Sequence, residues 1–408
     1  MRICLLTYRG NPYCGGQGIY IYYLSRELTK LGHEVEVIAG PPYPEVPQGV
    51  RLHKLKGLNL YESNDSFFGT ISCIRNPVDF YEFIAVCLGF FPEPLTFSLR
   101  AYYKLRRLLS QQKFDIIHDN QGLGYGLLLM KRFKIPLIAT VHHPISIDRK
   151  LQLAEIKSLR ERLRLKKWYS FCRMQARVAK YMDRVITVSE SSRQTIMSFL
   201  NLPYNSLRVI HNGVDLDLFK RTDSIQGKQN SLILINSGEQ PIKGVTYLLE
   251  ALKILRNGTG FKLTIVGCPK RDGQYLRLVE EYGLGDLVNF TGRVTREELV
   301  DHYLSSEVCV VPSLYEGFGF PAVEAMSCKL PVVATTGGAL PELLGKDGDA
   351  GILVPPADPY ALAAAIKRLL DDRHLRQKMG ESGRKRMERH FTWEEAARKH
   401  LKVYQEVL

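Results

Sequence analysis

The sequence lacks the cysteine pairs and the long apolar runs that mark disulfide-rich, zinc-binding and membrane-spanning proteins. Its eight cysteines form no Cys-x-x-Cys pair, and no His-x-x-x-His motif is present, so neither a disulfide framework nor a zinc site is expected. No apolar run approaches the roughly 18 residues of a membrane span. The first apolar run, Ile3–Leu6, leads at once into polar Thr7–Gly10, which is not the pattern of a signal peptide. These absences predict a cytoplasmic protein with reduced, buried thiols.

Acidic residues are scarce in the first half of the chain. The net charge is +14, and nearly all of this excess lies in residues 1–200, so this half is expected to meet an anionic partner. The most basic segment, Arg149–Arg184, has apolar residues at helical spacing, and three interpretations stay open. It is a helix with a solvated outer face, a contact with an anionic membrane surface, or a nucleic-acid face. We favour them in that order, and expect no nucleic acid because no recognised binding module accompanies the charge.

At 408 residues the chain has room for two domains, and the first opens with a β-α-β pattern. The pattern predicts a strand at Arg2–Thr7, a helix at Ile19–Lys30 and a strand at Glu34–Ile38. The Gly-x-Gly-x-x-Gly fingerprint and the acidic residue of a nicotinamide site are both missing. Gly15 and Gly16, in the connection before the helix, suit a phosphate or a hydroxylated ligand and equally suit a tight turn.

Two histidines follow the predicted strand Leu137–Val141. Because ligands bind at the carboxyl ends of parallel strands, His142 is a candidate site residue and His143 a weaker one. Residues 41–100 are rich in proline and are expected to form irregular insertions and short helices. The pattern Asp215-Leu-Asp217 resembles a metal motif, but its surroundings favour a turn, and we expect no metal and no cofactor.

The stretch Pro312–Glu324 is the strongest functional signal. It follows the predicted buried strand Val308–Val311 and leads into a predicted helix at Ala322–Met326. Gly317 and Gly319 leave the connecting backbone bare, and Pro321 suits the first helical turn. A bare turn that opens a helix after a strand offers free N–H groups and the positive end of the helix dipole. The stretch therefore predicts an anion site.

Two carboxylates frame this stretch, Glu316 and Glu324. On an ideal helix, eight positions span about 12 Å along the axis, more than the roughly 5–9.5 Å of paired glycosidase carboxylates. The spacing favours two contacts with one extended ligand over an acid–base pair. Taken alone, two glutamates are more often a surface residue and a salt-bridged one, but the glycines and the strand–turn–helix context favour a site.

A second predicted α/β unit begins after the polar stretch Lys220–Asn230, which is typical of a linker. Its first strand is predicted at Leu232–Ile235 and its first helix at Val245–Leu255. Lys243 comes directly before Gly244 at the start of this helix. A lysine at this place can neutralise a diphosphate without a metal ion.

Glu316-x₇-Glu324 with Gly-Phe-Gly inside it resembles the signature of retaining glycosyltransferases of family 4. The runs Pro331–Glu342 and Gly351–Pro356 also resemble that family. The resemblance implies the α/β GT-B architecture, two Rossmann-like domains facing across a cleft. It divides the chain into residues 1–218 on the acceptor side, with 391–408 crossing back, and residues 219–390 on the donor side.

The resemblance also implies an activity, transfer of a hexosyl unit from a UDP- or GDP-sugar to a hydroxyl acceptor with retention and without metal. By the same resemblance, Glu316 contacts the donor sugar, Glu324 the ribose hydroxyls, and His142 the sugar. The remaining implied donor contacts are the backbone of Gly317, Phe318, Gly319 and Phe320, the phosphate-facing Gly15 and Gly16, the phosphate-binding Lys243, and the base contacts Arg293 and Val294. The chain departs from the family where a second phosphate-binding cation is usual, because Ser237–Glu239 contains no arginine.

Two other functions stay open at this point. A nucleotide-sugar 2-epimerase has the same two-domain form and needs no acceptor. A basic membrane- or nucleic-acid-binding module needs no sugar turnover at all.

Overall fold

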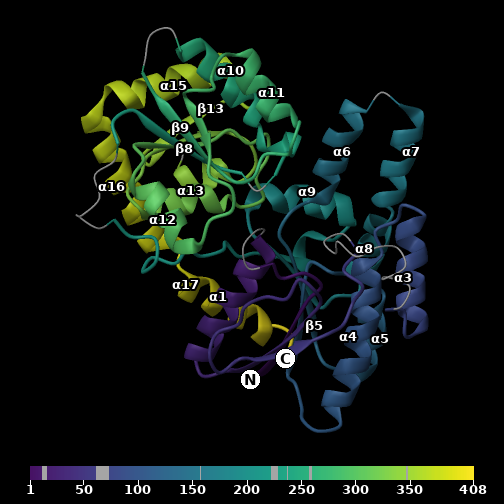
Figure 1. Cartoon of the computed structure of the whole chain (residues 1–408). Coiled ribbons are helices and arrows are strands. Elements are labelled where there is room, and N and C mark those ends of the chain that lie inside the picture. The colour runs from purple at the N-terminus through teal and green to yellow at the C-terminus, as the bar shows by residue number, and fades with distance from the viewer. Residues whose placement is uncertain are drawn as a thin grey trace. The chain divides into compact units, whose positions relative to one another are not determined.

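The computed structural model of the chain describes residues 1–11, 16–60, 73–156, 158–221, 228–236, 238–256, 260–345 and 348–408. It divides into two compact units, and each is a parallel sheet covered by helices (Figure 1). Unit 1 comprises Met1–Val188, Ser192–Ile210 and Ala396–Leu408, and unit 2 comprises Ser189–Ser191 and His211–Glu395. The domain boundaries expected from the sequence, 1–218 with 391–408 and 219–390, stay a prediction.

Unit 1 contains a seven-stranded parallel sheet in the order β3-β2-β1-β4-β5-β6-β7. Its central strands are almost entirely buried because helices cover both faces, and this explains their continuous apolar runs. The strands are β1 Arg2–Thr7, β2 Glu34–Ala39, β3 Arg51–Lys54, β4 Ile116–Asn120, β5 Leu137–Val141, β6 Arg184–Thr187 and β7 Leu207–Val209.

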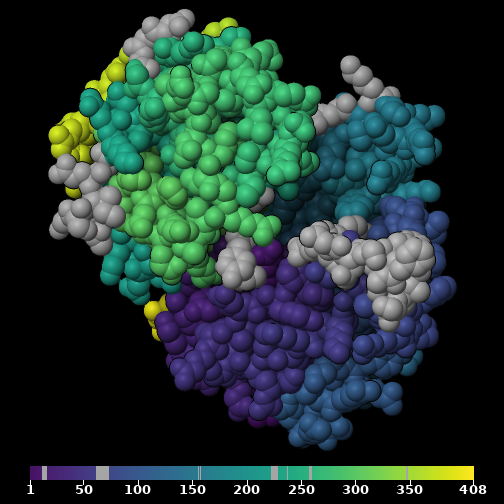
Figure 2. Space-filling view, in the orientation of Figure 1, coloured from purple at the N-terminus to yellow at the C-terminus, as the bar shows by residue number. Residues whose placement is uncertain are grey.

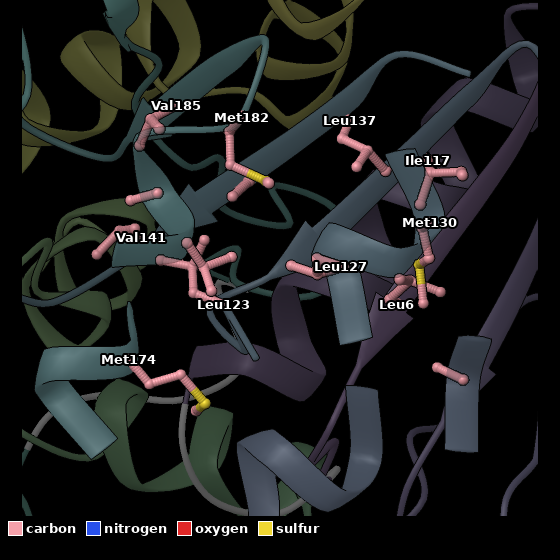
Figure 3. Packing of buried hydrophobic residues seen from close by; sticks show 14 of the residues in the cluster. Leu6, Ile117, Leu123, Leu127, Met130, Leu137, Val141, Met174, Met182 and Val185 are labelled. Carbon is pink, nitrogen blue, oxygen red and sulfur yellow. The ribbon is translucent and has the colours of Figure 1, made fainter. Parts of the chain in front are cut away.

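The helices of unit 1 pack on this sheet through one large apolar cluster. Figure 3 shows part of it, with Met130 of α5 next to Ile117 of β4 and Leu6 of β1. These helices are α1 Gly16–Lys30, α3 Pro77–Cys87, α4 Glu93–Leu109, α5 Gly126–Met130, α6 Ile145–Glu155, α7 Leu159–Trp168, α8 Phe171–Ala179, most of α9 Glu190–Leu200 and most of α17 Trp393–Gln405.

Unit 2 contains a six-stranded parallel sheet in the order β10-β9-β8-β11-β12-β13. Its strands are β8 Ser231–Ile235, β9 Lys262–Val266, β10 Val288–Phe290, β11 Val308–Val311, β12 Val332–Thr335 and β13 Gly351–Val354. A second apolar cluster forms its core, where α10 packs against α15 beside the strands. Its helices are α10 Val245–Leu255, α11 Gln274–Glu281, α12 Arg296–Leu304, α13 Phe320–Ser327, α14 Leu340–Leu344, α15 Pro359–Asp371 and α16 Arg373–His390.

Several predicted elements are confirmed to the residue, such as β5, β11 and α10. Two expectations need correction. The region 41–100 contains the expected short helix α3, but it also contains a strand, β3, and the start of the 17-residue helix α4. Of the seven cysteines that the structure describes, Cys73, Cys87 and Cys268 are exposed rather than buried. Glu316 lies in the connection before α13, as the predicted helix at Ala322–Met326 implied, so helical spacing does not set its distance from Glu324.

Candidate active site

The candidate site of unit 2 lies at the carboxyl edge of its sheet. The strand order reverses between the neighbouring strands β8 and β11, so the connections after these two strands leave toward opposite faces. In open parallel sheets, ligands bind in the crevice at such a point. The connections after β8, β11 and β12 carry Lys243, Glu316 and Gly338 respectively.

Lys243 is placed by the glycine that follows it. Gly244 has φ +64°, and a Cβ there would overlap the carbonyl oxygen of Pro312, so only glycine lets this connection approach the end of β11. A backbone hydrogen bond of 2.7 Å joins the two connections. As a result, Lys243 Nζ lies 2.8 Å from Glu316 Oε1.

Glu316 is a buried carboxylate with one oxygen engaged. Its Oε1 accepts from Lys243 Nζ at 2.8 Å and from Ser313 Oγ at 2.7 Å. Its backbone pairs with the connection after β12, because the amide of Ala339 donates to its carbonyl at 2.9 Å and a Cβ at Gly338 would overlap that carbonyl. Within the described part of the chain, both of these side-chain hydrogen bonds are to Oε1.

The N-terminus of α13 lies in the same connection. Gly319, its N-cap, has φ +109°, and Pro321 occupies the first turn as predicted. No side chain caps this end, and among the described residues no acceptor is recorded for the amides of Gly319 and Phe320. Phe318 is buried and its ring packs against neighbouring phenylalanines, so only its backbone can meet a ligand. The carbonyl of Gly317 accepts from a serine hydroxyl of the same unit at 2.7 Å.

Glu324 lies on α13 and is buried. Its Oε2 accepts from the hydroxyl of Tyr303 on α12 at 2.9 Å. Burial raises the pKa of Glu324 to about 7, and the tyrosine hydrogen bond partly opposes that rise. Burial and the nearby carboxylate hold the pKa of Tyr303 well above its usual value. Glu324 therefore changes its charge near neutral pH, which is unusual for a glutamate.

The region Ser237–Glu239, which lacks the arginine expected from the family resemblance, has a different role in this structure. Glu239 stands in that region, and its Oε2 accepts from the amide of Gln274, the first residue of α11, at 3.2 Å. A carboxylate at a helix N-terminus is favourable, so Glu239 stabilises α11 here. Ser237 lies outside the described residues. Arg293, exposed, and Val294, half-buried, follow β10, two strands away from β8.

Unit 1 has its own reversal of strand order, between β1 and β4. Gly16 is the first residue of α1, in the connection after β1; Gly15 lies outside the described residues.

His142 follows β5 and donates from Nε2 to Asn120 Oδ1, at the end of β4, over 2.6 Å. Burial lowers the pKa of His142 to about 3, so the ring is neutral and Nδ1 carries a lone pair. The structure thus gives His142 a fixed orientation; its contact with a donor sugar stays a prediction.

A directed chain of hydrogen bonds surrounds this histidine. The Nδ1–H of His400 donates to a backbone carbonyl at 2.7 Å, so its Nε2 accepts from Tyr20 at 2.8 Å. Tyr20 then accepts from Thr140 (2.9 Å), Thr140 from His118 (2.7 Å), and His118 from Tyr404 (2.7 Å). The chain ties α17 and α1 to strands β4 and β5, and every donor in it has one acceptor.

The Asp215–Asp217 pattern forms a turn, as predicted. Asp215 Oδ1 accepts from the backbone amides of Asp217 and Leu218, each at 3.1 Å, which is the geometry of an Asx turn. Among the residues that the structure describes, no group of three or more histidine, cysteine and acidic side chains is arranged to hold a metal ion.

The basic segment forms α6, α7 and α8, and Figure 2 shows α6 and α7 at the surface. Helix α7 has five Lys and Arg residues against one Glu and no buried residue. It also exposes two leucines, Leu159 at 74% and Leu163 at 54%. These two leucines lie one helical turn apart among the basic side chains of α7. In the described part of the chain, no helix is long and apolar enough to cross a membrane.

Three site residues were missed in the sequence. Ser313 lies three positions before Glu316 and donates to its carboxylate. A hydroxyl so close in sequence to a candidate carboxylate is a local signal that the sequence offers. Asn236 directly follows β8, is 5% exposed, and has a buried Oδ1 for which the described residues offer no hydrogen-bond partner; a polar residue directly after a buried strand is also a signal. The hydrogen bond between Tyr303 and Glu324 joins two helices, and no local sequence pattern predicts it.

Comparisons with known proteins identify the family to which this chain is similar. The profile of the family described as "Glycosyl transferases group 1" matches residues 219–386, and that described as "Glycosyltransferase Family 4" matches residues 14–218. An MMP alpha-(1->4)-mannosyltransferase from Mycolicibacterium hassiacum is 41% identical over 412 residues, covering 100% of this chain and 98% of that protein.

Solved structures also align over the whole chain. A sucrose-phosphate synthase from Thermosynechococcus elongatus superposes with a TM-score of 0.75 at 25% identity, covering 100% of this chain and 99% of the other. The Anabaena protein Alr3699/HepE, solved in complex with UDP-glucose, has a TM-score of 0.72 at 16% identity with full coverage of both chains. At 16% identity, the similarity to Alr3699/HepE shows a shared fold and nothing more.

Proposed function

Because this chain belongs to the family 4, group 1 glycosyltransferases and has their GT-B fold, we propose that it transfers a hexosyl unit from a nucleoside-diphosphate sugar to a hydroxyl acceptor with retention. The donor is UDP- or GDP-linked, and no metal takes part. The mannosyl unit is the best-supported sugar, since the relative with 41% identity is named as a mannosyltransferase.

One observation carries the proposal. A lysine, a buried carboxylate and an uncapped helix N-terminus meet at the strand-order reversal of unit 2: Lys243, Glu316 and the amides of Gly319 and Phe320. A cation beside free amides suits a diphosphate. A carboxylate oxygen beside them suits a sugar hydroxyl.

The chemistry follows from where charge develops. As the glycosidic bond breaks, negative charge builds on the departing diphosphate, and Lys243 with the α13 amides stabilises it electrostatically. The sugar becomes oxocarbenium-like. Glu316 Oε1 already accepts two hydrogen bonds, which suits a residue that positions the sugar better than a nucleophile. We therefore favour attack from the same face, with a leaving phosphate oxygen accepting the proton of the acceptor hydroxyl.

Further contacts complete the proposal. Glu324 meets the ribose hydroxyls, the backbone of Gly317 and Phe318 faces the sugar and phosphates, and Arg293 and Val294 meet the base. Gly15, Gly16 and His142 of unit 1 contribute a phosphate contact and a sugar contact. Asn236 adds a buried acceptor in the connection after β8 that also carries Lys243.

The experiment is a screen of UDP- and GDP-sugars, including GDP-mannose, for release of free nucleotide by mass spectrometry. Lys243→Ala and Glu316→Ala are expected to lose most turnover while remaining folded. Lys367→Ala is the matched control, since it breaks a lysine–carboxylate pair on the exposed face of α15. Full activity in folded Lys243→Ala protein would remove its phosphate role. The epimerase and binding-module alternatives gain no support from the relatives; an epimerase would convert its sugar without any acceptor.

We also propose that α7 meets an anionic membrane surface, because exposed leucines stand among its basic residues. Binding to liposomes is expected to rise with anionic lipid and to fall with salt. Replacing Leu159 and Leu163 by serine should weaken it, whereas Tyr360→Ser, which changes an equally exposed side chain of unit 2, should not. Absence of binding to anionic liposomes would leave only the solvated-face interpretation.

A further inference from the structure

Three residues where β6 leads into α9 belong to unit 2, although the residues on either side of them belong to unit 1. They are Ser189–Ser191, here called the crossing segment. Its side-chain and backbone hydrogen bonds within unit 2 all go to the connections after β11 and β12, beside the candidate site. None of the three residues has a role in the function proposed above.

The hydroxyl of Ser189 holds one peptide group of the site. Ser189 is fully buried, and its Oγ donates to the carbonyl oxygen of Gly317 at 2.7 Å. In a planar trans peptide, the N–H of the following residue points the opposite way from the carbonyl. Ser189 therefore fixes the directions of the Gly317 carbonyl and the Phe318 amide together, directly after Glu316 and directly before Gly319, the N-cap of α13.

The two amides of the crossing segment that follow are held by a carboxylate on α14. Glu342 Oε2 accepts from the amide of Glu190 at 2.9 Å, and its Oε1 accepts from the amide of Ser191 at 2.7 Å. His211 Nε2 lies 3.0 Å from the same Oε2. Burial alone would raise the pKa of Glu342, but the hydrogen bonds from His211 and the two amides outweigh it and lower the pKa. Glu342 is therefore a charged acceptor at neutral pH, which suits the start of a helix.

The crossing segment thereby joins the two connections that carry the candidate site. In the connection after β11, Ser189 binds the peptide that follows Glu316. In the connection after β12, the amide of Ala339 donates to the carbonyl of Glu316 at 2.9 Å, and α14, which begins at the next residue, carries Glu342. Glu316 therefore lies between two backbone restraints, and the crossing segment links one to the other.

The geometry of this turn matters for the proposed reaction. In that reaction Glu316 meets the sugar, and the amides of Gly319 and Phe320 meet the diphosphate. The peptide of Gly317 lies between these two sets of contacts, so its rotation would move one relative to the other. A misplacement of about 1 Å can cost roughly 100-fold in rate.

We propose that Ser189 and Glu342 are positioning residues, which hold the turn at residues 316–320 in the geometry that the donor requires. The inference rests on the glycosyltransferase function proposed above. Neither residue touches the donor in it, because Ser189 acts through the Gly317 carbonyl and Glu342 acts through the crossing segment. A hydrogen bond that served stability alone would lower the free energy of unfolding when removed and leave kcat of the folded enzyme unchanged.

The test compares Ser189→Ala and Glu342→Ala with two matched controls, Ser306→Ala and Glu307→Ala. Ser306 is a buried serine whose Oγ donates to a backbone carbonyl at 2.8 Å. Glu307 accepts from a backbone amide at 2.8 Å and from an arginine at 2.9 Å. Both controls directly precede β11, so they lie at the edge of the sheet opposite the site.

Three quantities are measured for each full-length variant. They are kcat and KM for the donor that the screen identifies, the free energy of unfolding in urea, and amide hydrogen exchange, without donor, in the peptide that contains residues 316–320. Ser189→Ala is expected to lose about 10- to 100-fold in kcat/KM and to exchange faster in this peptide. Glu342→Ala should change both quantities in the same direction. The controls should lose stability, as for any buried hydrogen bond, and keep the parental kcat/KM and exchange.

Parental kcat/KM in folded Ser189→Ala protein would overturn the inference. Unchanged exchange at residues 316–320, or an equal loss of kcat/KM in Ser306→Ala, would overturn it as well. If Ser189→Ala does not fold, Glu342→Gln decides, because it keeps the size of the side chain and replaces two carboxylate oxygens by one acceptor; it must then show the faster exchange. Exchange needs no donor, so a failed donor screen with faster exchange in Ser189→Ala refutes the transfer reaction and not the restraint on the turn.

Discussion

The ion pair between Lys243 and Glu316 allows stability and catalysis to be separated with three variants: Lys243→Met, Glu316→Gln and the double variant. In the parent, Glu316 is 8% exposed and its Oε1 accepts from Lys243 and Ser313. The lysine side chain is 28% exposed, so the pair is only partly shielded from solvent.

The stability costs follow from these contacts. Lys243→Met leaves a buried carboxylate with one hydrogen bond fewer, at a cost of about 1–3 kcal/mol in the free energy of unfolding. A glutamine at position 316 still accepts from Ser313 and carries no charge, so Glu316→Gln should cost about 1 kcal/mol. The double variant buries no unpaired charge, and its cost should be below the sum of the two single costs, as expected for coupled neighbours.

The rates should behave differently. If Lys243 stabilises a departing diphosphate, its loss costs about 10²- to 10³-fold in kcat. The double variant then has a kcat no higher than that of Lys243→Met. If Lys243 serves only as a partner for Glu316, the double variant recovers activity together with stability. The assay is nucleotide release under donor saturation, beside urea unfolding of each variant. Recovery of kcat in the stabilised double variant would refute the phosphate role.

Three further predictions concern other sites. Burial lowers the pKa of His400 to about 4 from 6.5, so the parent should lose about 3 kcal/mol of stability as pH falls from 6.5 to 4; His400→Gln should lack that part of the pH dependence in urea unfolding. Gly244→Ala should lose several-fold in donor affinity and more stability than Gly32→Ala, because both glycines have positive φ but only Gly244 lacks space for a Cβ; equal losses would contradict this. Donor KM should fall as pH rises through about 7, where Glu324 becomes charged, and Tyr303→Phe should move that midpoint upward in a pH series of KM; an unmoved midpoint would assign the titration elsewhere.

Buried strands and amphipathic helices could be predicted because their pattern is local. Val308–Val311 and Leu137–Val141 are continuous apolar runs, and Val245–Leu255 repeats its apolar residues at helical spacing, so periodicity alone gives these elements. The strand Arg51–Lys54 was missed because its side chains, Arg-Leu-His-Lys, suit the half-exposed edge of the sheet that it occupies.

The candidate site could be predicted only in part. The bare turn around Gly319 and the lysine before Gly244 are signals within a few residues. The pairing of Lys243 with Glu316 depends on a close backbone approach at Pro312, 68 positions after Gly244 in the numbering, and no local pattern contains it. The same holds for the chain through Tyr20 and His400, which are 380 positions apart.

The central claim is that unit 2 binds the diphosphate of its donor between Lys243 and the start of α13. A crystal structure with GDP or UDP bound tests it most directly. The account predicts diphosphate oxygens within about 3 Å of Lys243 Nζ and of the amides of Gly319 and Phe320. A nucleotide bound at another place, with the Lys243–Glu316 pair and these amides out of its reach, would contradict it.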